Sequence, residues 1–381
     1  MKTKIKIVAI ITGLANGGTE TMLLKLLEKI DRSKFEFIIV SLTSKGYIGE
    51  RIEKLGYKVY PISMGKFPSP WKFWKLVNLL QELQPNLVHT RLNHANLVGG
   101  IAARIANIEK VCWGVHQSNI SFWHNKFFTI LTIKVCALMS KRIPCCILTN
   151  SENARKVHVD IGFSSSSFHV IPNGFDLTRF KPNYRSRLSM LKEIHLPENT
   201  ILIGLIGRYD SQKNHQGFFD AAAEVSKKFD NVHFLLAGDR IDDHNASLKK
   251  IIKNKSLEKK VHLLGFRRDV PKIMASLDVF VSSSVGEAFP NVLGEAMSSG
   301  TPCVATDVGD CAEIIGETGH VVNTEDMKTL ALRIIELLNL SFKQRKRLGD
   351  TARKRILEKF ELNKIVSNYE DFYLKLIQGS I

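Results

Sequence analysis

Two glutamates enclose most of the segment GEAFPNVLGEAMSSG, residues 286–300, in which seven residues separate Glu287 from Glu295. Pro290 suits the first turn of a helix over about 290–299, because the N–H group that proline lacks would have no partner there. The start of such a helix carries a partial positive charge and can bind phosphate, while carboxylates accept hydrogen bonds from hydroxyl-rich ligands such as sugars. A helix with one acid at its start and a second on its solvated face explains the same residues equally well.

Two cations follow another strand-like run. The segment LIGRYDSQKNH (205–215) places Arg208 and Lys213 five residues apart in a polar loop. An arginine fork and a mobile lysine charge can together neutralise a diphosphate. Two solvated surface charges are the alternative for this pair alone.

A pair of glycines, Gly17 and Gly18, stands between the first strand-like run and a helical pattern. Glycines there let the backbone approach a ligand, and the following helix offers N–H groups to an anion. The spacing is not the G-x-G-x-x-G pattern of dinucleotide-binding proteins. A simple tight turn is the competing interpretation.

The elements that must position these residues follow an α/β pattern, because short β-branched runs alternate with longer segments of helical period. The alternation restarts after IPNGFDLTRFKPN, which predicts two doubly wound domains over 1–178 and 179–362, followed by an amphipathic helix at about 363–381 that we expect to pack back on the first domain. Ligands of such sheets bind at the carboxyl ends of the strands, which favours a site in a crevice between the domains. The predicted strands cover 4–12, 35–42, 58–63, 86–90, 110–116, 145–151, 168–174, 200–208, 231–239, 260–266, 278–284 and 301–307.

Composition agrees with a two-domain globular protein of 381 residues, with 44% hydrophobic and 24% charged content. The formal net charge of +17 lies mostly in the first half, where residues 1–180 hold 24 basic and 11 acidic side chains against 30 and 26 in residues 181–381. This asymmetry favours an anionic partner, either nucleic acid, acidic lipid or a phosphate-bearing substrate, although a well-solvated surface has the same composition.

Six cysteines show neither a CxxC pair nor zinc-ligand spacing, so we expect reduced, buried thiols in a cytosolic protein. The N-terminal apolar run is interpreted as the first strand and not as a signal peptide. The most lipid-like stretch, 127–139, contains Lys134 and is shorter than the roughly 20 residues that span a bilayer. We therefore expect no membrane-spanning segment.

An aromatic and basic patch lies in GKFPSPWKFWKLVNLL, residues 65–80, and a smaller one in SFWHNKFF, residues 121–128. Rings beside lysines suit a bilayer interface with anionic lipids. Base stacking in single-stranded nucleic acid and ordinary packing under a loop are the alternatives. The residues proposed for a membrane patch are Lys66, Trp71, Lys72, Trp74 and Lys75.

Taken together, GRYDSQKNH, GEAFPNVLGEAMSSGTPCVATDVGDCAEII, GGTE and VIPNGFDLTRFKP closely resemble the retaining GT-B glycosyltransferases of family 4. The resemblance covers nearly the whole chain. It implies two Rossmann-like doubly wound domains that face an interdomain crevice and a nucleotide-sugar donor bound there. Two departures are Arg240, where the family often has glycine, and Ala288 in the EAF sequence.

The resemblance also implies roles for single residues. Glu287 would face the hydroxyls of the donor sugar, Glu295 the ribose, and Arg208 and Lys213 the diphosphate. His116 matches a histidine that the family places near the donor sugar. The implied catalytic residues are Glu287, Arg208, Lys213 and His116, and the implied donor-binding residues are Gly17, Gly18, Gly265, Phe289, Pro290, Asn291, Val292 and Glu295.

The implied reaction is sugar transfer with retention, with a UDP-sugar favoured as donor. No metal cofactor is expected, because Asp-x-Asp, the usual metal-diphosphate anchor of the other major glycosyltransferase fold, is absent from the sequence. The expected acceptor is a lipid-linked glycan in surface polysaccharide or lipopolysaccharide synthesis. We expect an anionic membrane surface as a further partner and no nucleic acid. The expected location is cytoplasmic and peripheral, on the inner face of the cell membrane. A sugar-nucleotide epimerase and a non-catalytic membrane-surface homologue are the competing functions.

Overall fold

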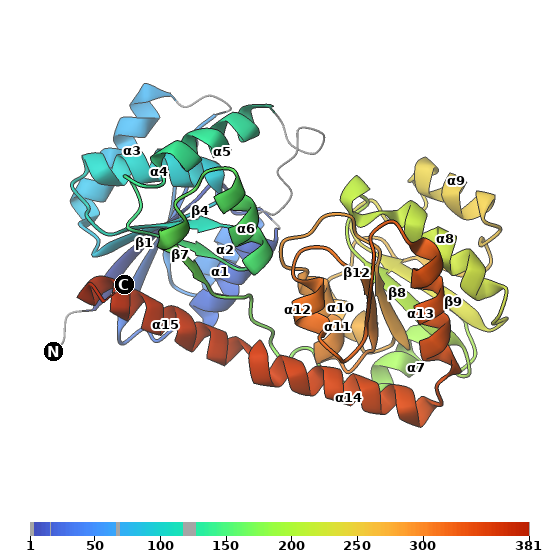
Figure 1. Cartoon of the computed structure of the whole chain (residues 1–381). Coiled ribbons are helices and arrows are strands. Elements are labelled where there is room, and N and C mark those ends of the chain that lie inside the picture. The colour runs from blue at the N-terminus through green and yellow to red at the C-terminus, as the bar shows by residue number, and fades with distance from the viewer. Residues whose placement is uncertain (1–3, 16, 66–68, 117–126, 381) are drawn as a thin grey trace. The chain divides into compact units, whose positions relative to one another are not determined.

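Two units make up the chain in the computed structural model, which describes residues 4–15, 17–65, 69–116 and 127–380. Unit 1 comprises Met1–Gly174 together with Leu362–Ile381, and unit 2 comprises Phe175–Glu361. The chain therefore leaves unit 1, completes unit 2 and returns to unit 1 for its last helix (Figure 1).

Unit 1 contains a parallel sheet whose seven strands, among the described residues, lie in the order β3-β2-β1-β4-β5-β6-β7. Its inner strands are buried along almost their whole length, because helices cover both faces of a parallel sheet and demand apolar side chains on each. The strands are β1 Ile5–Ile11, β2 Phe35–Ser41, β3 Lys58–Pro61, β4 Leu87–Arg91, β5 Val111–Val115, β6 Cys146–Thr149 and β7 Phe168–Val170.

The helices of unit 1 form two layers (Figure 1). α1, α2 and α15 pack on one face of the sheet, and α3, α4 and α5 pack on the other. Tyr373 of α15 contacts the rings of Phe35 and Phe37 at centroid distances of 6.1 and 5.9 Å, so the C-terminal helix belongs to this core. The bounds are α1 Gly18–Lys29, α2 Gly46–Lys54, α3 Pro70–Leu83, α4 Asn93–Ile105, α5 Phe127–Met139, α6 Glu152–Asp160 and α15 Leu362–Gln378.

Unit 2 contains a second parallel sheet, in which the described strands lie in the order β10-β9-β8-β11-β12-β13. All twelve predicted strands of the chain are present, most of them shorter than predicted and β4 displaced by one residue, but β13 was not predicted. This three-residue edge strand is too short to show an alternating pattern in the sequence. The strands are β8 Ile201–Ile206, β9 Val232–Ala237, β10 Val261–Leu263, β11 Val279–Ser282, β12 Cys303–Thr306 and β13 His320–Val322.

Helices again cover both faces, with α7, α10, α11, α12 and α14 on one side and α8, α9 and α13 on the other. The helix predicted over about 290–299 begins at Asn291, with Pro290 as its N-cap. The bounds are α7 Tyr184–Glu193, α8 His215–Ser226, α9 Ala246–Asn254, α10 Val270–Met274, α11 Asn291–Ser298, α12 Cys311–Ile315, α13 Met327–Asn339 and α14 Phe342–Lys359.

The cysteines are all reduced, but the expectation that they are buried is wrong for one of them. Cys145 is exposed because it lies just before β6, and the others are buried. No helix in the described ranges has the length and apolar character that a membrane crossing requires.

Both units contain buried histidines that stay uncharged, among them His158 in unit 1 and His215 in unit 2. Burial lowers the pKa of His158 to about 4, with a partial offset from the Ala154 carbonyl. Burial and then the charge of Lys213 lower the pKa of His215 to about 4, with a partial offset from Asp210. Both side chains are nearly inaccessible, at 0% and 3% exposure.

We therefore expect stability to fall as the pH drops below about 6.5, the pKa of histidine in an unfolded chain. Between that pH and about 4 the unfolded chain binds protons that the folded chain does not, on the order of 3 kcal/mol for each histidine at the lower end. The measurement is the thermal midpoint from pH 8 to pH 4.5 at low and high salt. A midpoint that is constant between pH 7 and pH 5 would contradict this expectation.

Candidate active site

The loop after β8 carries the two predicted diphosphate ligands. Asp210 caps a short 3₁₀ turn, Ser211–Lys213, by accepting a hydrogen bond from the Gln212 N–H group at 3.0 Å, and Arg208 Nε donates to its other oxygen at 3.1 Å. Burial raises the pKa of Asp210, but the Gln212 N–H group, Arg208 and Lys213 outweigh it and hold the pKa below its usual value. An ionised aspartate therefore holds Arg208 beside the strand end.

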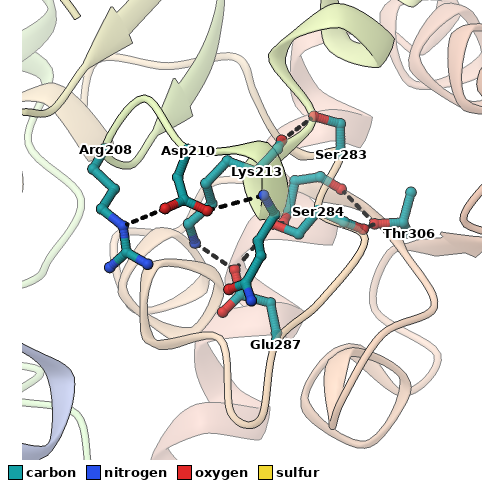
Figure 2. Close-up of polar contacts among 9 residues, drawn as sticks. Arg208, Asp210, Lys213, Ser283, Ser284, Glu287 and Thr306 are labelled. Carbon is teal, nitrogen blue, oxygen red and sulfur yellow. Dashed lines mark hydrogen bonds and ion pairs between the residues drawn. The ribbon is translucent and has the colours of Figure 1, made fainter. Parts of the chain in front are cut away.

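Lys213 and Glu287 form an ion pair in this site, as Figure 2 shows. Their side chains are only 20% and 16% exposed, so the pair is partly shielded from solvent. The Ser284 hydroxyl donates to the same Glu287 oxygen at 3.0 Å. The structure thus joins two side chains that lie 74 residues apart in the sequence and that were predicted to serve one ligand.

Hydroxyl groups at the ends of two neighbouring strands hold these loops together (Figure 2). Ser283 Oγ, at the end of β11, lies 3.0 Å from the carbonyl oxygens of both Lys213 and Asn214. Thr306 Oγ1, at the end of β12, donates to the Ser284 carbonyl at 2.5 Å. These positioning residues were not predicted. The signal that could have found the serines is the SSS sequence at 282–284, which begins at the last residue of β11, whereas Thr306 has no such signal.

On the other side of Glu287 the chain enters α11. Pro290 provides no side-chain cap, and Asn291 and Val292 form the half-buried first turn. Glu295, also half-buried, lies one turn further along, as predicted from the spacing. The ring of Phe289, in contrast, is 6% exposed and belongs to the core of unit 2, so a donor contact there would use its backbone.

The Glu287 loop is held from behind by the loop after β12. The Asp310 N–H group donates to the Ala288 carbonyl at 3.0 Å. Gly309 has φ of +55°, and a Cβ atom built there would lie 2.5 Å from the Glu287 carbonyl oxygen. Only glycine combines this backbone conformation with so close an approach.

The predicted residue Gly265 has φ of +67°, and a Cβ atom there would meet nothing within 4 Å. Arg240, which replaces the usual family glycine, also has a positive φ, of +59°. Its guanidinium donates to the Tyr209 carbonyl at 2.5 Å, which holds this residue in a conformation that glycine adopts more easily.

Three predicted residues lie in unit 1. Gly17 caps α1 and Gly18 begins it, neither with a positive φ, and a Cβ atom on Gly17 would clash with the Glu20 carboxylate. His116 follows β5, and burial, then the charge of Arg91, lower its pKa to about 3 despite a partial offset from the Asn150 side chain. Its imidazole is therefore neutral.

A metal site is not seen: within the described ranges, no group of three or more His, Cys, Asp or Glu side chains could hold a metal ion.

Two family models match the chain. The model described as "Glycosyltransferase Family 4" matches residues 16–179, and the model described as "Glycosyl transferases group 1" matches residues 200–340. The two matched ranges contain all the predicted catalytic residues.

Similar proteins carry the same assignment. The chain is 26% identical over 312 residues to the putative glycosyltransferase EpsF of Bacillus subtilis, covering 79% of each. It is 25% identical over 313 residues to the UDP-Gal:alpha-D-GlcNAc-diphosphoundecaprenol alpha-1,3-galactosyltransferase of Escherichia coli, covering 79% of this chain and 78% of that one. A crystal structure of Anabaena Alr3699/HepE in complex with UDP and glucose has a TM-score of 0.84 at 22% identity, covering 97% of this chain and 100% of that one.

Both sheets, their helix layers and both halves of the sequence thus agree with the same class of enzyme. This chain belongs to the glycosyltransferases, with the GT-B fold and the sequence signature of family 4.

Proposed function

We propose that the enzyme transfers a sugar, with retention of configuration, from a UDP-sugar to a lipid-linked glycan acceptor in surface polysaccharide or lipopolysaccharide synthesis. The observation that carries the proposal is the Lys213–Glu287 ion pair next to the start of α11, since it joins a phosphate ligand to a sugar ligand. The Escherichia coli relative, which is named for UDP-Gal and a diphosphoundecaprenol-linked acceptor, and the UDP and glucose bound to HepE support these substrate classes.

The pair also suggests how the donor enters. In the free protein Lys213 and Glu287 neutralise each other. The donor replaces both partners at once, because its diphosphate takes Lys213 and its sugar hydroxyls take Glu287. Charge that develops on the departing diphosphate is then stabilised by Arg208, by Lys213 and by the N–H groups at the start of α11.

Glu287→Ala should reduce transfer by about one to two orders of magnitude, since each charged hydrogen bond to the sugar contributes about 1.5–3 kcal/mol. Affinity for UDP alone should stay the same or increase, because Lys213 loses its carboxylate partner. Glu295→Ala should weaken UDP binding through the ribose. Calorimetric titration with UDP and transfer rates measure the two effects separately.

Glu287→Gln is the matched control, because it keeps the size of the side chain and removes its charge. Its transfer rate should lie between the rates of the wild type and of Glu287→Ala. If folded Glu287→Ala transfers sugar at a near-normal rate, the carboxylate is only a charge at a helix start. An epimerase would instead convert the donor without any acceptor, which product analysis detects.

We further propose that transfer requires no divalent metal, because Arg208 and Lys213 provide the positive charge for the diphosphate. Transfer should persist after exhaustive chelation and should change less than about twofold when magnesium or manganese is returned. Loss of most activity on chelation, with recovery on adding either metal, would disprove metal independence.

The membrane proposal concerns one helix layer of unit 1. On α3, Trp71 and Trp74 are 86% and 52% exposed, and Lys75 is exposed too, whereas Lys72 donates to the Ser63 carbonyl. Lys66, and almost all of residues 121–128, lie outside the described residues. On α5, in the same layer, the exposed apolar side chains are Phe128, Leu131 and Leu138.

Exposed rings and lysines together suit an anionic bilayer. We propose that this layer holds the enzyme on the inner face of the cell membrane, where a lipid-linked acceptor would lie. Figure 1 shows α3, α4 and α5 as neighbouring helices over the sheet.

Replacing Lys72 and Lys75 with glutamate should abolish salt-sensitive binding to anionic liposomes, since each lysine contributes about 1 kcal/mol near such a surface. Replacing Trp71 and Trp74 with alanine should weaken the salt-resistant part. The control, with the same change of charge on α9 of unit 2, is Lys249→Glu with Lys250→Glu. Liposome sedimentation measures binding, and equal binding by all variants would reject this surface.

A further inference from the structure

Buried polar atoms without hydrogen-bond partners gather at the carboxyl ends of β4 and β5 in unit 1. Arg91 ends β4 and is 1% exposed, yet among the described residues its Nε and Nη1 atoms have no partner. The same is true of Nε2 of His116 and Nε2 of His89. The Tyr369 hydroxyl makes no hydrogen bond of good geometry to a described residue either, although it lies close enough to Arg91 to favour the charge of that residue. Most buried polar groups in proteins are paired, so several unpaired ones in one place call for an explanation.

These side chains form a single cluster. Arg91 and Gly114 are register partners in neighbouring strands, and a Cβ atom on Gly114 would lie 3.1 Å from His116 Nε2 and 3.4 Å from Arg91 Cγ. The Arg91 Cζ atom lies 5.7 Å from the centre of the Tyr369 ring. The residue after Arg91, Leu92, has φ of +76°, a strained conformation for a branched side chain.

The cluster carries a buried positive charge whose main partners are phenols and not carboxylates. Arginine stays protonated in proteins; burial opposes its charge, but the phenols of Tyr369 and Tyr373 outweigh burial and raise the pKa of Arg91, and the main influences on it include no carboxylate. Burial, followed by the charge of Arg91, lowers the pKa of both His89 and His116, and burial raises the pKa of Tyr369. Both imidazoles and the phenol are therefore neutral near pH 7. A buried charge without a counter-ion is unfavourable by several kcal/mol.

Packing on α15 accounts for only part of this arrangement. The Tyr369 ring offers Arg91 a cation–π contact, and Tyr373 donates to or accepts from His89 Nδ1 at 2.9 Å. Neither contact supplies a negative charge. Buried water could satisfy the free N–H groups, but it could not compensate the charge either.

We propose that this cluster is an anion-binding site of unit 1, with Arg91 as the charged donor, that receives a carboxylate or phosphate group of a substrate. It lies at the edge of the sheet where open α/β folds bind ligands. The identity of the substrate rests on the proposed function and has two sources, the carboxylate of a uronic acid in the donor or the phosphate of a polyprenyl-linked acceptor.

The first test measures the thermal unfolding of the wild type and of Arg91→Met with inorganic phosphate. The control is sodium chloride of equal ionic strength. Saturating UDP is present throughout, so that the site in unit 2 is already filled. Phosphate should raise the wild-type midpoint, and Arg91→Met should lose this response. The free variant should be as stable as the wild type or more stable, because a buried charge is gone. Tyr369→Phe keeps the charge and should keep the response.

The second test distinguishes the sources by calorimetry. If the donor supplies the anion, Arg91→Met should bind UDP-glucuronate roughly 10- to 100-fold more weakly and UDP-glucose unchanged. If the acceptor supplies it, the same loss should appear with farnesyl diphosphate. Each arm measures binding, so an absence of sugar transfer would count against the proposed function alone.

The result that overturns the proposal is a folded Arg91→Met protein that responds to phosphate and binds every probe as the wild type does. A lower thermal midpoint of that variant would then identify Arg91 as an anchor for α15 and nothing more.

Discussion

The contact on which the candidate site depends is the ion pair between Lys213 and Glu287. The two residues are 74 positions apart in the sequence, and their contact joins the loop after β8 to the loop after β11. A partly buried pair keeps its place only if both backbones are fixed, because flexible loops would lose entropy on forming it. Ser283 fixes the Lys213 backbone, and Gly309 lets the following loop close behind Glu287. Backbone contacts therefore hold both ends of the pair in place, an arrangement that suits the electrostatic stabilisation proposed above.

Much of the fold could be predicted from the sequence, because parallel sheets covered on both faces demand β-branched runs that stand out between helical segments. The edge strand β13 could not, since His320–Val322 is too short to show a period and its pairing depends on β12. The predicted start of α11 differs from the observed start by one residue, because proline is accommodated equally well at the N-cap position and in the first turn of a helix. Cys145 was placed among the buried thiols although only its neighbour, Cys146, points into the core.

The charged residues of the site could be predicted because their spacing within a loop or helix start is local. What holds them could not, since Ser283 and Thr306 are ordinary strand-end hydroxyls until the sheet order brings β8, β11 and β12 together. Phe289 was predicted as a donor-binding residue from its place in the same loop as Glu287, and the burial of its ring, which leaves only its backbone for such a contact, could not be predicted from the loop sequence alone. Arg91 gave no signal at all, since a charged residue that ends a strand is usually solvated.

The return of the last helix to the first unit has a consequence for the order in which the protein forms during synthesis. Unit 2 is continuous from Phe175 to Glu361, so all of its residues are synthesised before those of α15. The core of unit 1 lacks Tyr369, Phe372, Tyr373 and their neighbours until those residues emerge. N-terminal domains generally fold first on the ribosome. Here one apolar face of the unit 1 sheet has only α1 and α2 on it until α15 has been synthesised, so the core of unit 1 is completed after all of unit 2 has been made.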